Sequence, residues 1–219
     1  MKVLITDGLS KAGQEILQNA GIEFHIEFFE PTALIEAIKP YDGVLVRSAS
    51  RIPRAVIDSG SNLKFIARAG AGVDNIDVEY AKSKNIPVMN TPGANSASVA
   101  ELVLAHMFAL ARFIHQSNLT MRDGKWEKKL YKGIELDGKT LGIVGFGKIG
   151  QILAKKALAL GMELIAYDVL DIKTELPVKF VSLDELLSKS DFVSLHVPKM
   201  SRPLIGAAEL EKMKKSAFL

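Results

Sequence analysis

Three glycines with the spacing G-x-G-x-x-G directly follow an apolar run in this 219-residue chain. They are Gly145, Gly147 and Gly150, and the run before them, residues 141–144, reads Leu-Gly-Ile-Val. The first glycine permits a tight strand-to-helix turn, the second lets the main chain approach a diphosphate, and the third lets the helix pack closely on the sheet. The helix expected from Lys148 would point its N–H groups and positive dipole end at the phosphates. The spacing therefore predicts a dinucleotide site.

An acidic residue at the end of the next expected strand bears on which dinucleotide binds. Asp168 follows the apolar run 163–167, and its carboxylate could accept hydrogen bonds from the adenosine ribose and repel a 2′-phosphate. That favours NAD over NADP. The alternative is that Asp168 only caps a helix or forms a turn. FAD and S-adenosylmethionine sites use related loops, so the glycines alone do not decide the chemistry.

The elements that must position these residues alternate along the whole chain. Apolar runs at 3–5, 24–28, 44–46 and 65–67 alternate with helical patterns at 10–19, 32–38, 53–59 and 77–84. The rhythm resumes with strands expected at 141–144, 163–167 and 192–195 and helices at 148–160, 183–188 and 206–215. Such alternation predicts parallel βαβ units, hence an α/β fold. Residues 85–96 contain two prolines and several turn formers, which favours a crossover between two domains.

Composition excludes several classes of function. The net charge of +3 comes from 28 basic and 25 acidic residues, which is no signal for nucleic acid. The absence of cysteine excludes a disulfide scaffold, a thiolate nucleophile and a cysteine zinc site. Lysines flank Trp126 and Tyr131, but without a wider basic surface a connecting segment is favoured over a nucleic-acid site. The first apolar run is too short for a signal peptide, so we expect a cytoplasmic protein.

The most apolar helical stretch, residues 99–111, is interrupted by Glu101 and His106. It is shorter than the roughly 20 residues that a membrane span requires. A helix that is apolar nearly all round is typical of one buried between domains or subunits. The sequence thus predicts neither a membrane nor a nucleic-acid partner.

Four motifs carry a resemblance to a known family. They are RAGAGVDNID (68–77), NTPGANSASVAELVLA (90–105), LDGKTLGIVGFGKIG (136–150) and HVP (196–198). In these motifs the chain resembles the D-2-hydroxyacid dehydrogenases, and within them most resembles the D-3-phosphoglycerate dehydrogenases. The resemblance implies a flavodoxin-like substrate domain at 1–97 and a Rossmann-type NAD-binding domain at 98–219, incomplete at its C-terminus, with the active site between them. It also implies a homodimer formed through the helix 98–112.

The resemblance also assigns site residues. The residues matching substrate-binding positions are Arg47, Ser48, Ala71, Gly72, Val73 and Asn95. The residues matching cofactor-binding positions are Ala71, Gly145, Gly147, Lys148, Ile149, Gly150, Asp168, His196, Val197 and Pro198. Independently, the turn 71–73 after an expected strand suits an anion, although an ordinary βα turn stays possible. Arg47, Arg51 and Arg54 form a cationic group suited to phosphate, unless the last two are solvated helix residues.

Hydride transfer needs a group that takes the hydroxyl proton and a cation that polarises the carbonyl. In the resembled family these are a histidine oriented by a glutamate, and an arginine, and none of them matches a residue of this chain. We therefore expect no catalytic and no metal-ligating residue here, and expect the sequence to be part of a longer enzyme. The expected function is NAD-dependent oxidation of a D-2-hydroxy acid, with 3-phosphoglycerate going to 3-phosphohydroxypyruvate at the head of serine synthesis. The alternative is a non-catalytic NAD-binding sensor or corepressor-like module.

Overall fold

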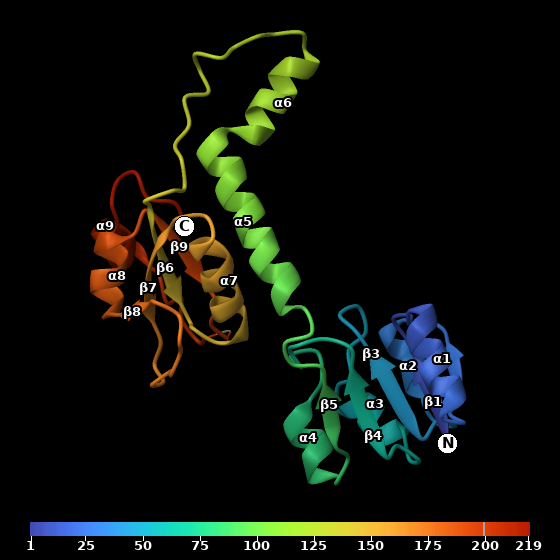
Figure 1. Cartoon of the computed structure of the whole chain (residues 1–219). Coiled ribbons are helices and arrows are strands. Elements are labelled where there is room, and N and C mark those ends of the chain that lie inside the picture. The colour runs from blue at the N-terminus through green and yellow to red at the C-terminus, as the bar shows by residue number, and fades with distance from the viewer. Residues whose placement is uncertain (199) are drawn as a thin grey trace. The chain divides into compact units, whose positions relative to one another are not determined.

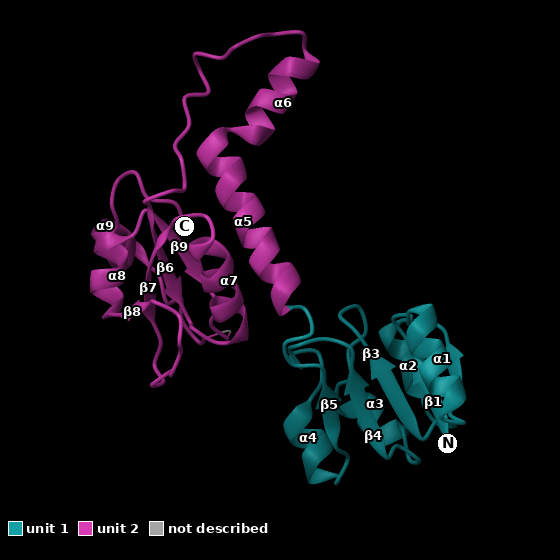
Figure 2. Cartoon of the chain, in the orientation of Figure 1, with its two compact units in different colours: residues 1–95 teal, residues 96–219 magenta. Residues whose placement is uncertain are grey.

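The computed structural model describes residues 1–198 and 200–219 and consists of two compact units (Figure 2). Unit 1 comprises Met1–Asn95 and unit 2 comprises Ser96–Leu219. The boundary lies after Asn95, whereas the sequence placed it after residue 97. Each unit has its own sheet and its own buried core, so the two are described in turn.

Unit 1 contains a five-stranded parallel sheet in the order β2-β1-β3-β4-β5. Its strands are β1 (Lys2–Ile5), β2 (Glu23–Ile26), β3 (Gly43–Val46), β4 (Phe65–Arg68) and β5 (Val88–Asn90). This order is that of flavodoxin-like sheets, in which ligands bind where the strand order reverses, here between β1 and β3. The flavodoxin-like prediction is confirmed. The crossover predicted at 85–96 was partly wrong, because residues 88–90 join the sheet as its last strand.

The four described helices of unit 1 are α1 (Lys11–Asn19), α2 (Pro31–Ala37), α3 (Arg54–Ser59) and α4 (Val78–Ser83). Two of them, α1 and α4, begin with a side-chain cap. The Ser10 hydroxyl accepts the Gly13 N–H, and the Asp77 carboxylate accepts the Tyr80 N–H, which satisfies main-chain donors that the helix leaves unpaired. The central strands are apolar along their length because helices cover both faces of a parallel sheet. Leu4, Val44 and Ile66 are accordingly fully buried.

Unit 2 contains a four-stranded parallel sheet in the order β8-β7-β6-β9. Its strands are β6 (Thr140–Val144), β7 (Glu163–Tyr167), β8 (Lys179–Phe180) and β9 (Phe192–Leu195), with a single parallel bridge from Phe192 to Phe218. Counted within the unit, this is the 3-2-1-4 order of a Rossmann sheet, whose order reverses between β6 and β9. The helices of this sheet are α7 (Lys148–Leu158), α8 (Leu183–Lys189) and α9 (Ala207–Lys212). The Rossmann-type prediction is confirmed.

Two further helices, α5 (Ser96–Arg112) and α6 (Ile114–Arg122), precede this sheet, and α5 lies beside α7 (Figure 1). The face of α5 with Ala100, Met107 and Ala111 is buried. Phe113 separates the helices in a left-handed conformation, and their axes bend by 62°. Among the described residues, no single helix has the length and apolarity to cross a membrane. Only the bent pair α5–α6, taken together, meets those two criteria.

Candidate functional site

The three glycines of unit 2 meet three different steric demands. Gly145 has a φ of +89°, and a Cβ there would lie 2.6 Å from the His196 carbonyl oxygen. A Cβ on Gly150 would lie 2.5 Å from the Gly145 carbonyl oxygen, so this glycine lets α7 pack against the end of β6. A Cβ on Gly147, in contrast, would meet no atom within 4 Å. Two glycines thus shape the turn, and the third faces open space where a ligand can approach the main chain.

The helix that follows this turn starts without a side-chain cap. Gly147 is the N-cap residue of α7, which is 11 residues long, and it makes no side-chain cap hydrogen bond. Main-chain N–H groups and the positive end of the helix dipole favour an anion there. Lys148 is exposed and Ile149 is half-buried in the first turn of α7. The turn therefore fits the diphosphate of a dinucleotide.

Asp168 lies at the carboxyl end of β7 and is bonded to the glycine turn. Its Oδ2 accepts the Phe146 N–H at 2.7 Å, and its Oδ1 accepts the Leu170 N–H at 3.0 Å. The bond from Leu170 forms a local turn, which is the alternative role that the sequence left open for Asp168. Each carboxylate oxygen can accept more than one hydrogen bond, so the same group can still bind ribose hydroxyls. Together with Gly147 and the start of α7, it fits NAD.

His196 follows β9 and faces the same edge of the unit 2 sheet. Its N–H donates to the Val144 carbonyl at 2.7 Å, and its Nε2 lies 3.0 Å from the Ser194 hydroxyl oxygen. Burial lowers the pKa of His196, so the imidazole is neutral at pH 7. Val197 and Pro198, which come next, are exposed. Nine of the ten residues predicted to bind cofactor thus lie at the carboxyl ends of β6, β7 and β9. The tenth, Ala71, belongs to unit 1.

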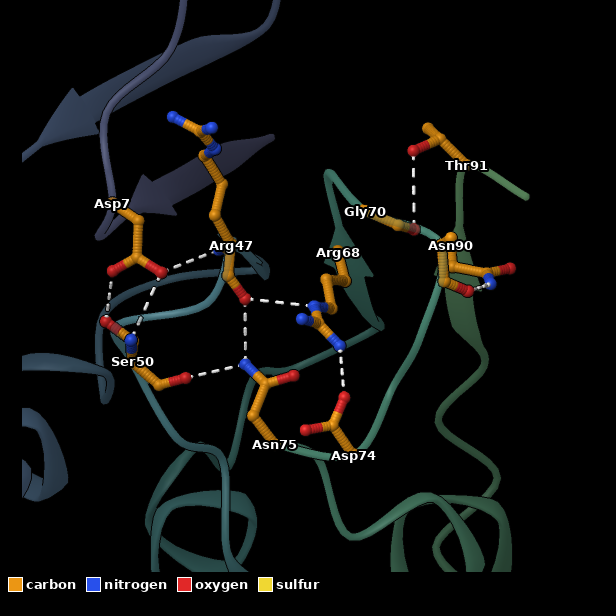
Figure 3. Close-up of polar contacts among 10 residues, drawn as sticks. Asp7, Arg47, Ser50, Arg68, Gly70, Asp74, Asn75, Asn90 and Thr91 are labelled. Carbon is orange, nitrogen blue, oxygen red and sulfur yellow. Dashed lines mark hydrogen bonds and ion pairs between the residues drawn. The ribbon is translucent and has the colours of Figure 1, made fainter. Parts of the chain in front are cut away.

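In unit 1, three side chains hold the main chain of Arg47 (Figure 3). They come from the segment after β1, the last residue of β4 and the segment after β4. The Arg47 N–H donates to Asp7 Oδ2 at 2.6 Å. Its carbonyl oxygen accepts from Arg68 Nε at 3.0 Å and from Asn75 Nδ2 at 2.9 Å. The guanidinium makes no hydrogen bond or ion pair with a residue that the structure describes, and it extends away from the network in Figure 3. Ser48, next along the chain, is exposed.

The turn 70–73 after β4 offers main-chain donors at the same edge. Three of its carbonyl groups accept hydrogen bonds: Gly70 O from the Thr91 N–H at 3.0 Å, Ala71 O from Asn90 Nδ2 at 2.6 Å, and Val73 O from the Ile76 N–H at 3.0 Å. The N–H groups of residues 71–73 donate to no group within the described part of the chain. A turn whose carbonyls accept hydrogen bonds within the protein, and whose N–H groups remain available, is suited to binding a carboxylate. This geometry is compatible with the anion-binding role predicted for Ala71, Gly72 and Val73.

Two further residues that the sequence singled out, Asn95 and Arg54, take no part in the hydrogen bonds around Arg47. Asn95 is exposed in the turn that ends unit 1. Arg54 pairs with Asp77 at 3.0 Å and its guanidinium lies 5.0 Å from the centre of the Tyr80 ring. Arg54 is therefore better described by the alternative, as an exposed helix residue and not as part of a phosphate site. No cluster of three or more potential metal ligands occurs in the described ranges.

Sequence reasoning missed four residues of the unit 1 network, namely Asp7, Ser50, Arg68 and Asn75. Asp7 comes two residues after the apolar run 3–5, near the carboxyl end of a strand where ligands bind in α/β folds. Arg68 and Asn75 belong to the quoted motif RAGAGVDNID. That these residues converge on Arg47 depends on β1, β3 and β4 being neighbours, which spacing alone does not reveal.

Comparisons with known proteins agree with both units. Residues 104–219 match the family model for the NAD-binding domain of the D-isomer specific 2-hydroxyacid dehydrogenases. The chain is 48% identical to hydroxypyruvate reductase from Thermotoga maritima, over 100% of this chain and 72% of that protein. It is 42% identical to D-3-phosphoglycerate dehydrogenase from Methanocaldococcus jannaschii, over 100% of this chain but only 43% of that protein.

A solved structure is similar over almost the whole chain. The TT0316 protein from Thermus thermophilus has a TM-score of 0.90 and 36% identity, covering 99% of this chain and 72% of that one. NAD, the cofactor predicted from Asp168 and the glycines, is confirmed by the matched family model. The match over residues 104–219 and the relative of 48% identity show that the chain belongs to the D-isomer specific 2-hydroxyacid dehydrogenase family.

Proposed function

We propose that this chain binds NAD through unit 2 and a D-2-hydroxy acid through unit 1, for oxidation of the acid to the 2-keto acid. When bound, NAD would supply the acceptor for the hydride at C2 of the substrate. The start of α7 and Gly147 hold its diphosphate, Asp168 holds its adenosine ribose, and residues 196–198 line the adenine. The observation that carries this assignment is the open space at Gly147 beside an uncapped helix start and a carboxylate.

The anion sites of unit 1 support an acid with two negative groups as the substrate. The N–H groups of residues 71–73 suit the carboxylate, and the guanidinium of Arg47 suits a phosphate. Both follow neighbouring strands, β4 and β3, at their carboxyl ends. This pair favours 3-phosphoglycerate. The relative named hydroxypyruvate reductase favours D-glycerate, which lacks the phosphate, as the second candidate.

Neither Arg47 nor the turn 71–73 is proposed as a catalytic group. Both are assigned to binding and orienting the acid. His196 is neutral and hydrogen-bonded to Ser194, and we assign it to the cofactor site and not to proton transfer.

Equilibrium binding tests these assignments without requiring turnover. Calorimetric titration with NAD should give saturable binding to one site per chain. In its presence, 3-phosphoglycerate should bind at least about tenfold more tightly than D-glycerate, since a charged hydrogen-bonded pair contributes this much. Equal affinities for the two acids would exclude the phosphate preference. NAD binding with no affinity for either acid would favour the alternative of a cofactor-sensing module, and no NAD binding would contradict the proposal.

We also propose that α5 and α6 form the interface of a homodimer. Although one face of α5 is buried, Leu102 and Leu110 on that helix and Leu119 and Met121 on α6 are exposed. Several exposed large apolar side chains on two successive helices favour a protein–protein interface.

A further inference from the structure

The network around Arg47 suggests how its side chain is directed. Three side chains, those of Asp7, Arg68 and Asn75, bond the main chain of Arg47 from both sides of the residue. None of them bonds its guanidinium. Because the main chain of Arg47 is held by side chains from the segment after β1, the end of β4 and the segment after β4, the base of its side chain has a fixed position while its charged end stays available.

Asp7 could in principle neutralise Arg47, but its bonds go elsewhere. Its Oδ2 accepts the N–H groups of Arg47 and Ser50 at 2.6 and 3.1 Å, and its Oδ1 accepts the Ser50 hydroxyl at 2.5 Å. Burial alone would raise the pKa of Asp7, but the hydrogen bonds from Ser50 and Arg47 outweigh it and lower the pKa. Asp7 is thus a charged anchor for two main-chain groups.

Asn75 holds the other side of the loop. Its Nδ2 donates to the Arg47 carbonyl at 2.9 Å and to the Ser50 carbonyl at 2.6 Å. Both partners are acceptors, so the amide has only one orientation that satisfies them. Its Oδ1 is buried and has no hydrogen-bond partner among the described residues. An unpaired buried acceptor lowers stability, so this amide favours the geometry of residues 47–50 at the expense of local stability.

We propose that Asp7 and Asn75 are positioning residues that act through the main chain of Arg47 to aim its guanidinium at the anionic group of the substrate. The inference rests on the proposed function of Arg47. Fixing a long side chain at its base reduces the entropy lost when it binds. Asp7 and Asn75 therefore affect substrate affinity without touching the substrate.

A double-mutant cycle tests this with 3-phosphoglycerate as the probe, titrated into the full chain in the presence of NAD. Arg47→Ala removes the guanidinium, and Asn75→Leu removes both carbonyl bonds at nearly constant volume. Each single variant should weaken binding by about tenfold. In the Arg47→Ala background, Asn75→Leu should have no further effect, because interacting residues are not additive.

Matched controls come from the same unit. Asn62 donates to the Lys39 carbonyl at 3.1 Å, and Asp42 accepts the Lys2 N–H at 2.7 Å at the opposite edge of the sheet. Asn62→Leu and Asp42→Ala should leave affinity for 3-phosphoglycerate unchanged, whereas Asp7→Ala should weaken it about as much as Asn75→Leu. Asp7→Asn, which keeps an oxygen for the two N–H groups, should be milder than Asp7→Ala.

The possible failures are distinguishable. Unchanged affinity in Arg47→Ala would contradict the proposed role of Arg47 itself. Weak binding in Arg47→Ala with normal binding in Asn75→Leu and Asp7→Ala would overturn the positioning role alone, as would an additive effect in the double variant. NAD affinity and the midpoint of thermal unfolding show whether each variant is folded. If Asn75→Leu does not fold, Ser50→Ala takes its place in the cycle, since its hydroxyl donates to Asp7, and additivity there overturns the proposal.

Discussion

At the scale of single residues, Asp168 combines a role in the fold with a proposed role in cofactor binding. It accepts hydrogen bonds from the N–H groups of Phe146 and Leu170, so it shapes the turn whose phosphate-binding geometry it also completes. A substitution of Asp168 therefore affects both the turn and the proposed contact with ribose. Comparing replacement by alanine with replacement by asparagine separates the two effects.

We predict that Asp168→Ala weakens NAD binding by about tenfold or more, because it removes both the ribose acceptor and the anchor of the turn. Asp168→Asn keeps an oxygen for the Phe146 N–H and should lose less affinity. Both variants should reduce discrimination against NADP, because both remove the negative charge. Calorimetric titration of each variant with both cofactors measures this. If neither affinity changed, Asp168 would have no part in ribose binding.

From the lowered pKa of the half-buried His196 we predict how the free energy of unfolding depends on pH. Burial lowers its pKa in the folded state, so below the ordinary value of about 6.5 the unfolded chain binds more protons. Above about pH 6.5, His196 therefore does not reduce the free energy of unfolding. As the pH falls from there towards the lowered pKa of the folded state, the free energy of unfolding decreases. His196→Gln should flatten this part of the profile. Urea denaturation between pH 5 and 8 measures it, and parallel profiles for the two proteins would contradict it.

Residue roles could be predicted from the sequence where the information is local. The three glycines and Asp168 have a fixed spacing set by one βαβ unit. Asp7 and Asn75 lie 68 positions apart in the chain and both bond Arg47 and Ser50, so their convergence needed the strand order. The network around Arg47 was therefore missed.

At the scale of elements, the turn between β6 and α7 contains two glycines whose substitution should have different effects. Gly145 has positive φ and no room for a Cβ, whereas Gly147 has φ −73° and open space around it. Substitution at the first position strains the fold, and substitution at the second obstructs only a ligand.

We predict that Gly147→Val leaves the free energy of unfolding nearly unchanged and abolishes NAD binding, because the side chain occupies the space next to the diphosphate. Gly145→Ala should lower the free energy of unfolding by at least about 1–2 kcal/mol, the cost of left-handed φ for a residue with a Cβ. Chemical denaturation and NAD titration measure both variants. Normal NAD binding by Gly147→Val would show that the diphosphate lies elsewhere.

The elements that the sequence missed are those with weak patterns. β5 and β8 are three and two residues long, too short for an alternating pattern. α6 was missed because its apolar residues do not form a buried stripe, and no residue of it is buried. The longer strands and helices were predicted correctly because their apolar runs are set by burial on both faces of each sheet.

At the scale of the whole molecule, α5 and α6 leave unit 2 with apolar surface that its own sheet does not cover. Leu102 is 58% exposed and Leu119 is 48% exposed. The helix predicted to be apolar nearly all round has one face against α7 and another that is open.

We predict that the protein is a dimer and that Leu102→Glu makes it monomeric, since a desolvated charge at an apolar interface opposes association. Ile16→Glu is the matched control, because Ile16 on α1 is 68% exposed outside this surface. Sedimentation equilibrium measures the mass of each variant. A monomeric parent protein, or a dimer that survives Leu102→Glu, would contradict an interface at Leu102.

The anion site proposed at residues 71–73 consists of main-chain N–H groups, and the carbonyls of Ala71 and of the preceding Gly70 accept hydrogen bonds from Asn90 and Thr91. Replacing a side chain does not delete a main-chain donor, so an alanine scan would score this turn as dispensable. Exchanging single amides for esters would remove one donor at a time. It follows that sequence variation at Ala71 and Val73 can alter access to the substrate while the carboxylate contact itself persists.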